Sequence, residues 1–381
     1  MKVLYLISGT IWGGATISFL TLIKGLREFG IEAIVVMSDR HEEFVQELEK
    51  IGVKYYVKSM RFCCYPVTKS LVDKILFCRR IVGVYRNNLN VEKEIENIIN
   101  AEGVDIIHTN VGPIRIGHNI AKKRSIPHVW HIREYGDLDF CIFEMPSKSY
   151  FRKLLHEDYV ITITKDLLYY NKLIDSHKAV TIYNGVMSLN DIVYNPHKEK
   201  YFLCCSRISP EKGHKDIVET FCRFHKNNPD YKLKILGEGS SKFVDELKSI
   251  AIKNGCSESI EFLGFKRDIR NYMSKAKALI VASPAEGFGR MTAEAAFVGC
   301  MIIGRNTAGT REIIEETGGL TFNTNDEMLT AMIQCTQMTH VEYERIVLRA
   351  QSVAQKLYSN EQYVQSVLDV YKKALKRKNL H

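Results

Sequence analysis

The chain has 381 residues, of which 45% are hydrophobic and 25% charged, and its formal net charge is +9. This composition is ordinary for a globular protein, and the length exceeds a typical single core, so we expect two domains and no long disordered segment. No stretch approaches the ~20 apolar residues of a membrane-spanning helix. No recognised nucleic-acid module accompanies the positive charge, so we expect no nucleic acid as a partner. The ten cysteines show no metal-ligand spacing and are expected to be reduced thiols of a cytoplasmic protein.

Strands and helices are predicted to alternate along both halves of the chain, a pattern typical of parallel sheets. In the first half, strands are predicted at 3–8, 32–37, 105–109, 128–131 and 159–163, with helices at 16–29 and 91–101. A polar segment, 184–200, contains Asn-Gly and Asn-Pro pairs and predicts a linker. The second half repeats the alternation to about residue 324, and 340–378 is predicted to be helical. We therefore expect an α/β fold with two doubly wound, Rossmann-like domains.

Glycines and polar side chains lie at predicted strand ends in the first half. Gly13 and Gly14 follow the first strand, where the backbone can approach a phosphate, although the loop lacks the Gly-x-Gly-x-x-Gly spacing of a nicotinamide site. His131, Arg133 and Glu134 end a later strand. We interpret His131 as a contact to a ligand, with a structural histidine as the alternative, and treat Arg133 and Glu134 as weaker candidates for ligand contact.

A basic segment lies between Arg61 and Arg86. Its basic residues are interleaved with apolar ones and few acids: Lys69, Lys74, Arg79 and Arg80 with Phe62, Leu71, Ile75, Leu76, Phe77 and Ile81. Such a segment can form a basic amphipathic helix on an anionic membrane surface. The alternative is a solvated basic face above an apolar stripe that points to the core.

The segment from Glu286 to Glu294 is predicted to join a buried strand to a helix. Gly287 and Gly289 let the backbone come close to a ligand, and the N-terminus of the helix attracts a phosphate. The two carboxylates can each accept hydrogen bonds from vicinal hydroxyls. These residue types suit a nucleotide sugar.

Two other predicted strand ends of the second half support this interpretation. The strand that begins at Tyr201 runs into Arg207 and Lys212, whose guanidinium and ammonium groups on one loop can hold a pyrophosphate. Gly237 follows the next strand. Because parallel strands end at the same edge of a sheet, we expect all three loops to form one site.

We expect neither a metal nor another cofactor. Asp137 and Asp139 form an Asp-x-Asp pair, which can hold a divalent cation on a diphosphate. No further ligands accompany the pair, and Arg207 and Lys212 already supply positive charge, so we interpret it as a coincidence.

Taken together, the Glu-x7-Glu element, the basic pair and the glycine loops resemble the group 1 type of retaining glycosyltransferase with the GT-B fold, over nearly the whole chain. The resemblance implies two Rossmann-like domains that face each other across a cleft. Residues 1–185 would form the acceptor domain, 186–360 the nucleotide-sugar donor domain, and 361–381 a helix crossing back to the first domain. Asn184-Gly185 resembles the turn at the domain crossing.

The resemblance also implies roles for single residues. Glu286 would contact the transferred sugar, Glu294 the ribose, and His131 the region near the transferred sugar. The implied catalytic residues are His131, Glu286, Arg207 and Lys212; the donor contacts are Gly13, Gly14, Arg207, Lys212, Gly237, Glu286, Gly287, Phe288, Gly289 and Glu294; the acceptor contacts are Arg133 and Glu134.

The activity implied is metal-independent transfer, with retention, of a hexose or related sugar from a nucleotide diphosphate sugar to a glycan or lipid-linked glycan. The setting implied is surface polysaccharide synthesis in the cytoplasm, with peripheral contact to the inner membrane face. Two alternatives stay open: a nucleotide-sugar epimerase of the same architecture, which would need no acceptor, and a non-catalytic donor-binding subunit.

Overall fold

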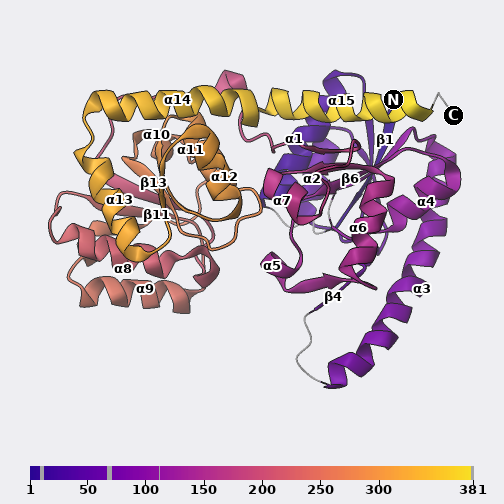
Figure 1. Cartoon of the computed structure of the whole chain (residues 1–381), viewed down its shortest axis with the longest axis horizontal. Helices are drawn as coiled ribbons and strands as arrows, with labels where there is room; N and C mark the ends of the chain where they lie inside the picture. The colour runs from indigo at the N-terminus through magenta and orange to yellow at the C-terminus, as the bar shows by residue number, and fades with distance from the viewer. Residues whose placement is uncertain (9–12, 67–70, 111, 379–381) are drawn as a thin grey trace. The chain divides into compact units, whose positions relative to one another are not determined.

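The computed structural model describes residues 1–8, 13–66, 71–110 and 112–378. The chain divides into two compact units, shown in Figure 1. Unit 1 comprises Met1–Gly185 together with Asn360–His381, and unit 2 comprises Val186–Ser359. Each unit has its own parallel sheet, as the alternation of strands and helices predicts. Within the described ranges, none of the helices has the length and apolar character needed to span a bilayer.

The sheet of unit 1 has seven strands in the order β3-β2-β1-β5-β6-β8-β9, all parallel. Its strands are β1 (Lys2–Ile7), β2 (Glu32–Met37), β3 (Lys54–Val57), β5 (Ile106–Thr109), β6 (His128–Ile132), β8 (Tyr159–Thr162) and β9 (Ala179–Thr181). The helices are α1 (Gly14–Glu28), α2 (Glu42–Lys50), α3 (Leu71–Glu102), α4 (Ile116–Arg124), α5 (Asp137–Phe140), α6 (Lys148–Glu157), α7 (Lys165–Tyr170) and α15 (Asn360–Lys378). A second, antiparallel sheet pairs β4 (Cys64–Pro66) with β7 (Ile142–Glu144).

Both faces of the unit 1 sheet are buried. Because successive side chains of a strand point to opposite faces, Tyr5 of β1 packs in the core under α1 and α15, while Leu6 packs in the core under α3 and α4. From α15, Tyr363 and Tyr371 are fully buried in the first of these cores. The last helix of the described chain is therefore an integral part of unit 1.

The sheet of unit 2 has six parallel strands in the order β12-β11-β10-β13-β14-β15. The strands are β10 (Tyr201–Cys205), β11 (Lys232–Leu236), β12 (Ile260–Phe262), β13 (Ala278–Val281), β14 (Met301–Arg305) and β15 (Leu320–Phe322). The helices are α8 (His214–His225), α9 (Ser241–Lys253), α10 (Arg270–Lys275), α11 (Arg290–Phe297), α12 (Ala308–Thr317), α13 (Asn325–Gln337) and α14 (His340–Tyr358), with short 3-10 turns η1 (Leu189–Asp191), η2 (Pro210–Lys212) and η3 (Ser257–Ser259).

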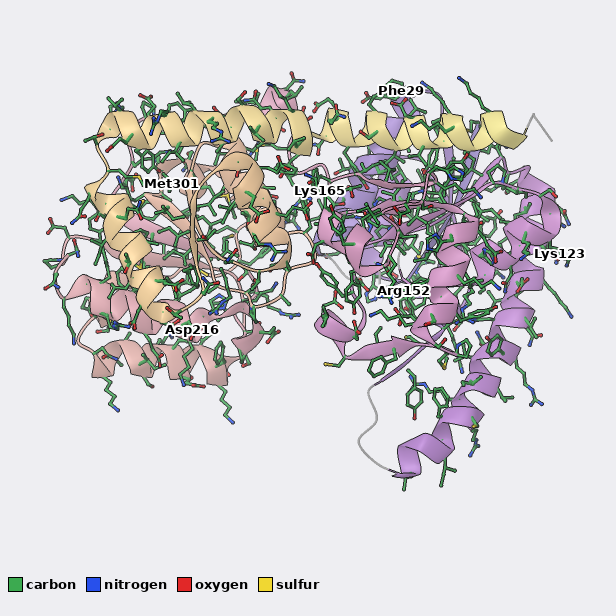
Figure 2. All side chains as sticks on the ribbon, viewed as in Figure 1. Phe29, Lys123, Arg152, Lys165, Asp216 and Met301 are labelled. Carbon is green, nitrogen blue, oxygen red and sulfur yellow. A yellow bond between two sulfur atoms is a disulfide. The ribbon has the colours of Figure 1, made fainter. Side chains whose placement is uncertain are left out.

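The two ends of strand β14 can be located in Figure 2 from the labelled residues Met301 and Asp216. Met301 begins the strand, and its amide donates to the hydroxyl of Tyr343 on α14 at 3.3 Å. Arg305 ends it, and its guanidinium donates to Asp216 on α8 at 2.8 Å. Met301 therefore marks the amino edge of the sheet, and Asp216 lies by the carboxyl edge.

Some expectations from the sequence are corrected. The predicted helix 340–378 is two helices, since Ser359 has an extended backbone between α14 and α15. The predicted helix 91–101 is only the last third of α3. Cys222 and Cys256 form a disulfide, so the expectation that every cysteine is reduced is wrong for this pair. Both sulfurs are buried in the core of unit 2, where α8 packs beside α9.

Candidate functional site

The strand order of unit 2 reverses between β10 and β13, because β10 leads to β11 on one side and β13 leads to β14 on the other. Such a switch point at the carboxyl edge of an open parallel sheet is where ligands bind. Arg207 and Lys212 follow β10, and Glu286 follows β13. The structure therefore brings the predicted basic pair and the first predicted carboxylate to the two strands that flank the switch point.

Lys212 and Glu286 form an ion pair across the switch point. The side chains are 24% and 21% exposed, so both remain reachable from solvent. Ser283 also donates its hydroxyl to Oε1 of Glu286 at 3.1 Å, which fixes the carboxylate at the end of β13. An anionic ligand here would exchange one partner of Lys212 for another.

Arg207 lies further out. Its side chain is 71% exposed, and it donates to Glu211 at 2.8 Å within the same loop. An ion pair this exposed contributes little free energy, so the guanidinium can turn to a ligand at small cost. Arg207 and Lys212 thus leave the same strand end, as predicted, but only Lys212 lies beside Glu286.

Two glycines hold the loops at this edge close together. Gly213 has φ of +71°, and a Cβ there would lie 2.5 Å from the carbonyl oxygen of Ala282, after β13. Gly237 has φ of +140°, and a Cβ there would lie 1.9 Å from the carbonyl oxygen of Ser206, after β10. Any other residue type would both strain the backbone and push neighbouring loops apart. Sequence reasoning singled out Gly237 as a ligand contact and missed the packing role of Gly213.

The loop after β13 leads into α11, and Gly289 (φ +86°) is the N-cap residue of this helix. The loop is also held from the α12 side, because the amide of Gly309 donates to the carbonyl of Glu286 at 3.0 Å. Gly287 is partly exposed, whereas Phe288 is buried and packs edge-on against Tyr358 at 5.9 Å. The amides of the first turn of α11, which have no acceptor within the helix itself, can therefore face a phosphate beside Gly287.

Glu294, the second predicted carboxylate, lies one turn into α11 and is only 7% exposed. Burial raises its pKa, against the pull of Arg290, which donates to its Oε1 at 2.7 Å. Arg290 also donates to the carbonyl of Val186 at 3.0 Å. Sequence reasoning missed Arg290, although its spacing of four residues from Glu294 on a helix is a signal for such a pair.

Sequence reasoning also missed Arg305. Its guanidinium donates to the carbonyl of Ala282 at 2.9 Å and to Asp216 on α8 at 2.8 Å. One side chain thus ties the ends of β13 and β14 to the start of α8. Its role is to hold the loops that carry the charged residues.

In unit 1, the predicted glycine loop is described only in part, since residues 9–12 lie outside the described ranges. Gly13 precedes α1 with an extended backbone, and its carbonyl accepts the first helical hydrogen bond from Ile17 at 3.0 Å. Gly14 begins α1 and is exposed. Both lie at the carboxyl end of β1, which with β5 flanks the switch point of the unit 1 sheet.

His131 is fully buried on β6. Its Nδ1 lies 3.3 Å from Nε2 of His108, whose Nδ1 lies 2.6 Å from the hydroxyl of Tyr371 on α15. Burial, reinforced by the charge of Arg133, lowers the pKa of both histidines well below the ordinary value. Within the described ranges, Nε2 of His131 has no hydrogen-bond partner. In this state His131 is a neutral, fully buried residue of β6.

Arg133 is buried and bonded within unit 1. Its guanidinium donates to Asn110 at 3.0 Å, to Asn184 at 2.6 Å and to Tyr363 at 3.0 Å. It therefore links the end of β6 to the chain segment that leaves unit 1 and to α15. Contact with an acceptor would require some of these bonds to be exchanged.

Glu134 is half-buried at the end of β6. Burial, with a further contribution from Asp139, raises its pKa to about 7 against the effect of Arg133. Asp139 itself accepts from the amides of Tyr135 at 2.9 Å and Gly136 at 2.7 Å. The carboxylate of Asp139 therefore caps the N-terminus of α5.

Asp137, the other half of the Asp-x-Asp pair, accepts from Lys148 at 2.9 Å and from Tyr170. Both members of the pair are thus engaged within the protein.

A separate cluster at the amino edge of the unit 1 sheet has the residue types of a metal site. Asp158 accepts from Nδ1 of His118 and of His128, each at 2.7 Å, and from the indole of Trp130 at 2.9 Å. Burial alone would raise the pKa of Asp158, but the two histidines hold it well below its usual range. Since three donors already converge on one carboxylate oxygen, the cluster is a hydrogen-bonded clamp between β6, β8 and α4.

The family model described as "Glycosyl transferases group 1" matches residues 190–335. An uncharacterized glycosyltransferase of Methanocaldococcus jannaschii is 25% identical over 311 residues, covering 79% of this chain and 78% of that protein. The alpha-monoglucosyldiacylglycerol synthase of Acholeplasma laidlawii is 24% identical over 305 residues, covering 72% and 76%.

Among solved structures, Anabaena HepE in complex with UDP has a TM-score of 0.79 to this chain at 18% identity, and the match covers 98% of this chain and 100% of HepE. At that identity the likeness concerns the fold.

Proposed function

We propose that this chain takes a hexose or related sugar from a UDP-sugar. It belongs to the group 1 glycosyltransferases with the GT-B fold and transfers a sugar from a nucleotide sugar. The observation that supports this most is the switch point of unit 2, where Lys212, Glu286 and the start of α11 meet. UDP is the nucleotide we favour because HepE has been crystallised with UDP and with UDP-glucose.

The chemistry follows from the charges at this edge. When the bond between the anomeric carbon and the diphosphate breaks, negative charge develops on the leaving phosphate and positive charge on the sugar. Lys212, Arg207 and the amides of α11 stabilise the phosphate. The acceptor oxygen bonds to the anomeric carbon on the face that the phosphate leaves, and the leaving phosphate oxygen takes the proton of that hydroxyl, so the anomeric configuration is retained. Glu286 accepts hydrogen bonds from the sugar, and Glu294 from the ribose.

The test uses UDP-glucose and a panel of other UDP-hexoses, with and without EDTA. We expect one donor to support UDP release that depends on an acceptor, to be unaffected by EDTA, and to be lost in Lys212→Ala. The product should have the anomeric configuration of the donor, as measured by NMR. Isomerised UDP-sugar without any acceptor would favour the epimerase, and UDP binding without turnover would favour the donor-binding subunit.

We further propose that the acceptor is a glycan or lipid-linked glycan and that unit 1 meets an anionic membrane surface through the first turns of α3. Figure 1 shows these turns projecting beyond the rest of unit 1. Val72, Ile75 and Leu76 are 64%, 76% and 47% exposed there, while Phe77 and Ile81 on the other side pack against a small core with Tyr65. The alternative of an apolar stripe that points to the core therefore accounts for only part of the apolar residues.

An exposed apolar strip has a partner of the right chemistry in a lipid surface. Arg79 and Arg86 are exposed on the same helix and can attract anionic headgroups. The relative from Acholeplasma laidlawii is, by its name, an enzyme of diacylglycerol lipids. The double variant Ile75→Asp with Leu76→Asp should lose co-sedimentation with anionic vesicles. Ile252→Asp, at a 68% exposed position of unit 2, is the matched control. Equal binding by the double variant and the control would refute the contact.

A further inference from the structure

A pocket in unit 1 lies at the carboxyl end of β6. It is partly open to solvent and encloses little space of its own, so a ligand would lie against its walls. Its walls combine apolar side chains with two carboxylates: Pro113, Ile132, Ile142 and Phe151, with Glu134 and Glu144. The carboxylates come from different elements, since Glu134 follows β6 and Glu144 ends β7 of the small antiparallel sheet. The pocket thus depends on the β4–β7 sheet as well as on the main sheet.

Neither carboxylate is saturated with hydrogen bonds. Oε2 of Glu144 is buried and has no partner among the described residues, and no hydrogen bond is among the causes that shift the pKa of Glu134. Two neighbouring polar side chains are engaged elsewhere, because Tyr135 donates to Asp166 and Asn171 donates to the carbonyl of Leu167. A buried acceptor without a donor is costly. The pocket is therefore suited to a ligand that brings hydrogen-bond donors.

The charge of the pocket restricts the ligand further. No lysine, arginine or histidine is among the described residues that line it. Arg133, which precedes Glu134 in the chain, donates to Asn110, Asn184 and Tyr363 instead. Burial raises the pKa of Glu144, against the nearby charges of Lys148 and Arg152, and it raises the pKa of Glu134 as well, so these surroundings disfavour negative charge. A phosphate or carboxylate on a ligand would bring further negative charge into the same buried surroundings, which disfavour it.

We infer that this pocket is a subsite for an uncharged sugar ring of the acceptor, whose hydroxyl groups donate to Glu134 and Glu144 while its apolar face lies against Phe151. This inference rests on the proposed transfer function. Sugar rings pair well with such a surface, since they carry hydroxyl donors at the edge and C–H groups on the face. It adds Glu144 to the acceptor site and excludes uronic acid or phosphorylated rings from this position.

The experiment measures binding of small probes by saturation-transfer NMR. The uncharged probes are the methyl glycosides of glucose, galactose, mannose and N-acetylglucosamine, and the charged probe is methyl glucuronide. For the wild-type protein we expect at least one uncharged probe to bind and the glucuronide to bind at least about tenfold more weakly. Glu134→Gln and Glu144→Gln should each weaken binding of the uncharged probe by about tenfold to a hundredfold, because a hydrogen bond to the carboxyl group is lost or weakened.

The same two variants should also reduce the ratio between the affinity for the uncharged probe and the affinity for the glucuronide, since the amide cannot carry a negative charge. A role confined to folding would not produce this opposite effect on two ligands. Glu43→Gln, at an exposed position of α2 in the same unit, is the matched control and should change neither affinity. Ile142→Trp fills the pocket and should abolish binding of every probe, while thermal protection by UDP persists.

The inference is overturned if no uncharged probe binds at millimolar concentration, if the glucuronide binds equally well, or if the two Gln variants behave as Glu43→Gln does. Failure of the proposed function has a different signature. In that case the wild-type protein would show neither thermal protection by UDP nor release of UDP from any UDP-hexose, whatever the pocket binds.

Discussion

The ion pair between Lys212 and Glu286 predicts an unusual result for Glu286→Gln. In the described structure Lys212 is held by the carboxylate that is expected to contact the sugar. A free nucleotide diphosphate must draw Lys212 away from Glu286, and the carboxylate also repels the phosphates. Removing that charge should therefore tighten the binding of UDP, although the same change removes a contact to the transferred sugar and slows transfer.

The size of the effect follows from the exposure of the pair. Two unit charges about 4 Å apart attract each other by about 4 kcal/mol at an effective dielectric constant of about 20. Since the side chains are 24% and 21% exposed, solvent screening reduces the usable part to about 1–2 kcal/mol. We expect the Kd of UDP to fall by about fivefold to thirtyfold, because about 1.4 kcal/mol corresponds to tenfold.

The assay is isothermal titration calorimetry with UDP, together with turnover of the preferred UDP-sugar. Glu211→Gln is the matched control, because it releases Arg207 from a pair whose members are 71% and 57% exposed. That variant should change the Kd of UDP by less than about twofold. Weaker binding of UDP by Glu286→Gln than by the wild-type protein would refute the reasoning, since it would mean that the carboxylate helps to hold the nucleotide.

Three further predictions concern stability and can be checked by thermal unfolding. Asp158→Asn should lower the free energy of unfolding by about 2–3 kcal/mol at neutral pH, because a buried acceptor of three hydrogen bonds is impaired. The pKa of Asp158 is depressed in the folded protein, so the stabilisation that its charge provides is complete above the unfolded pKa of about 4 and is lost as the pH falls. The difference in the free energy of unfolding between wild type and Asp158→Asn should therefore narrow below about pH 4. An unchanged gap from pH 7 to pH 2 would contradict this. Gly213→Ala should cost about 2–4 kcal/mol and weaken UDP binding, whereas Gly255→Ala, with a similar φ of +69° and open space around it, should cost about 1 kcal/mol and leave UDP binding intact. Arg290→Ala leaves Glu294 buried without its partner and should cost about 3 kcal/mol, which Arg290→Lys should partly restore; no loss in Arg290→Ala would show that water reaches Glu294.

The sequence predicts well what depends on local patterns. The strands that end before Arg207 and before the loop of Glu286 are found within about two residues, because buried parallel strands are short apolar runs that stop at polar or glycine residues. The loops then meet because parallel strands end at one edge. Lys212 and Glu286 meet at a switch point because β10 lies beside β13, which is the strand order that consecutive β-α units favour.

What the sequence misses depends on partners that are distant along the chain. Gly213 matters because of Ala282, and nothing near either residue indicates the other. His131 has the position of a substrate contact, but its burial depends on a layer of packing that includes α15, more than 200 residues later. The disulfide between Cys222 and Cys256 likewise joins two helical regions whose spacing matches no motif.

Helix α3 was predicted only in part for a different reason. Its first turns expose Ile75 and Leu76 rather than burying them, so the apolar residues do not follow the period of a helix packed on a single core. The period becomes regular near Val91 and Ile95, where the helix covers the main sheet, and this part was predicted as a helix; the basic segment before it was described only as one that can form an amphipathic helix.

The position of α15 has a consequence for how the molecule is made. Tyr363, Val367 and Tyr371 complete the core of unit 1, although the rest of that unit is synthesised before any part of unit 2. Unit 2 is one continuous stretch, so it can close its own core on the ribosome while the earlier unit still waits for a helix. The half of the chain that is made first is therefore the half that finishes folding last, and a nascent chain stopped after Ser359 would carry one finished unit and one with an open apolar face.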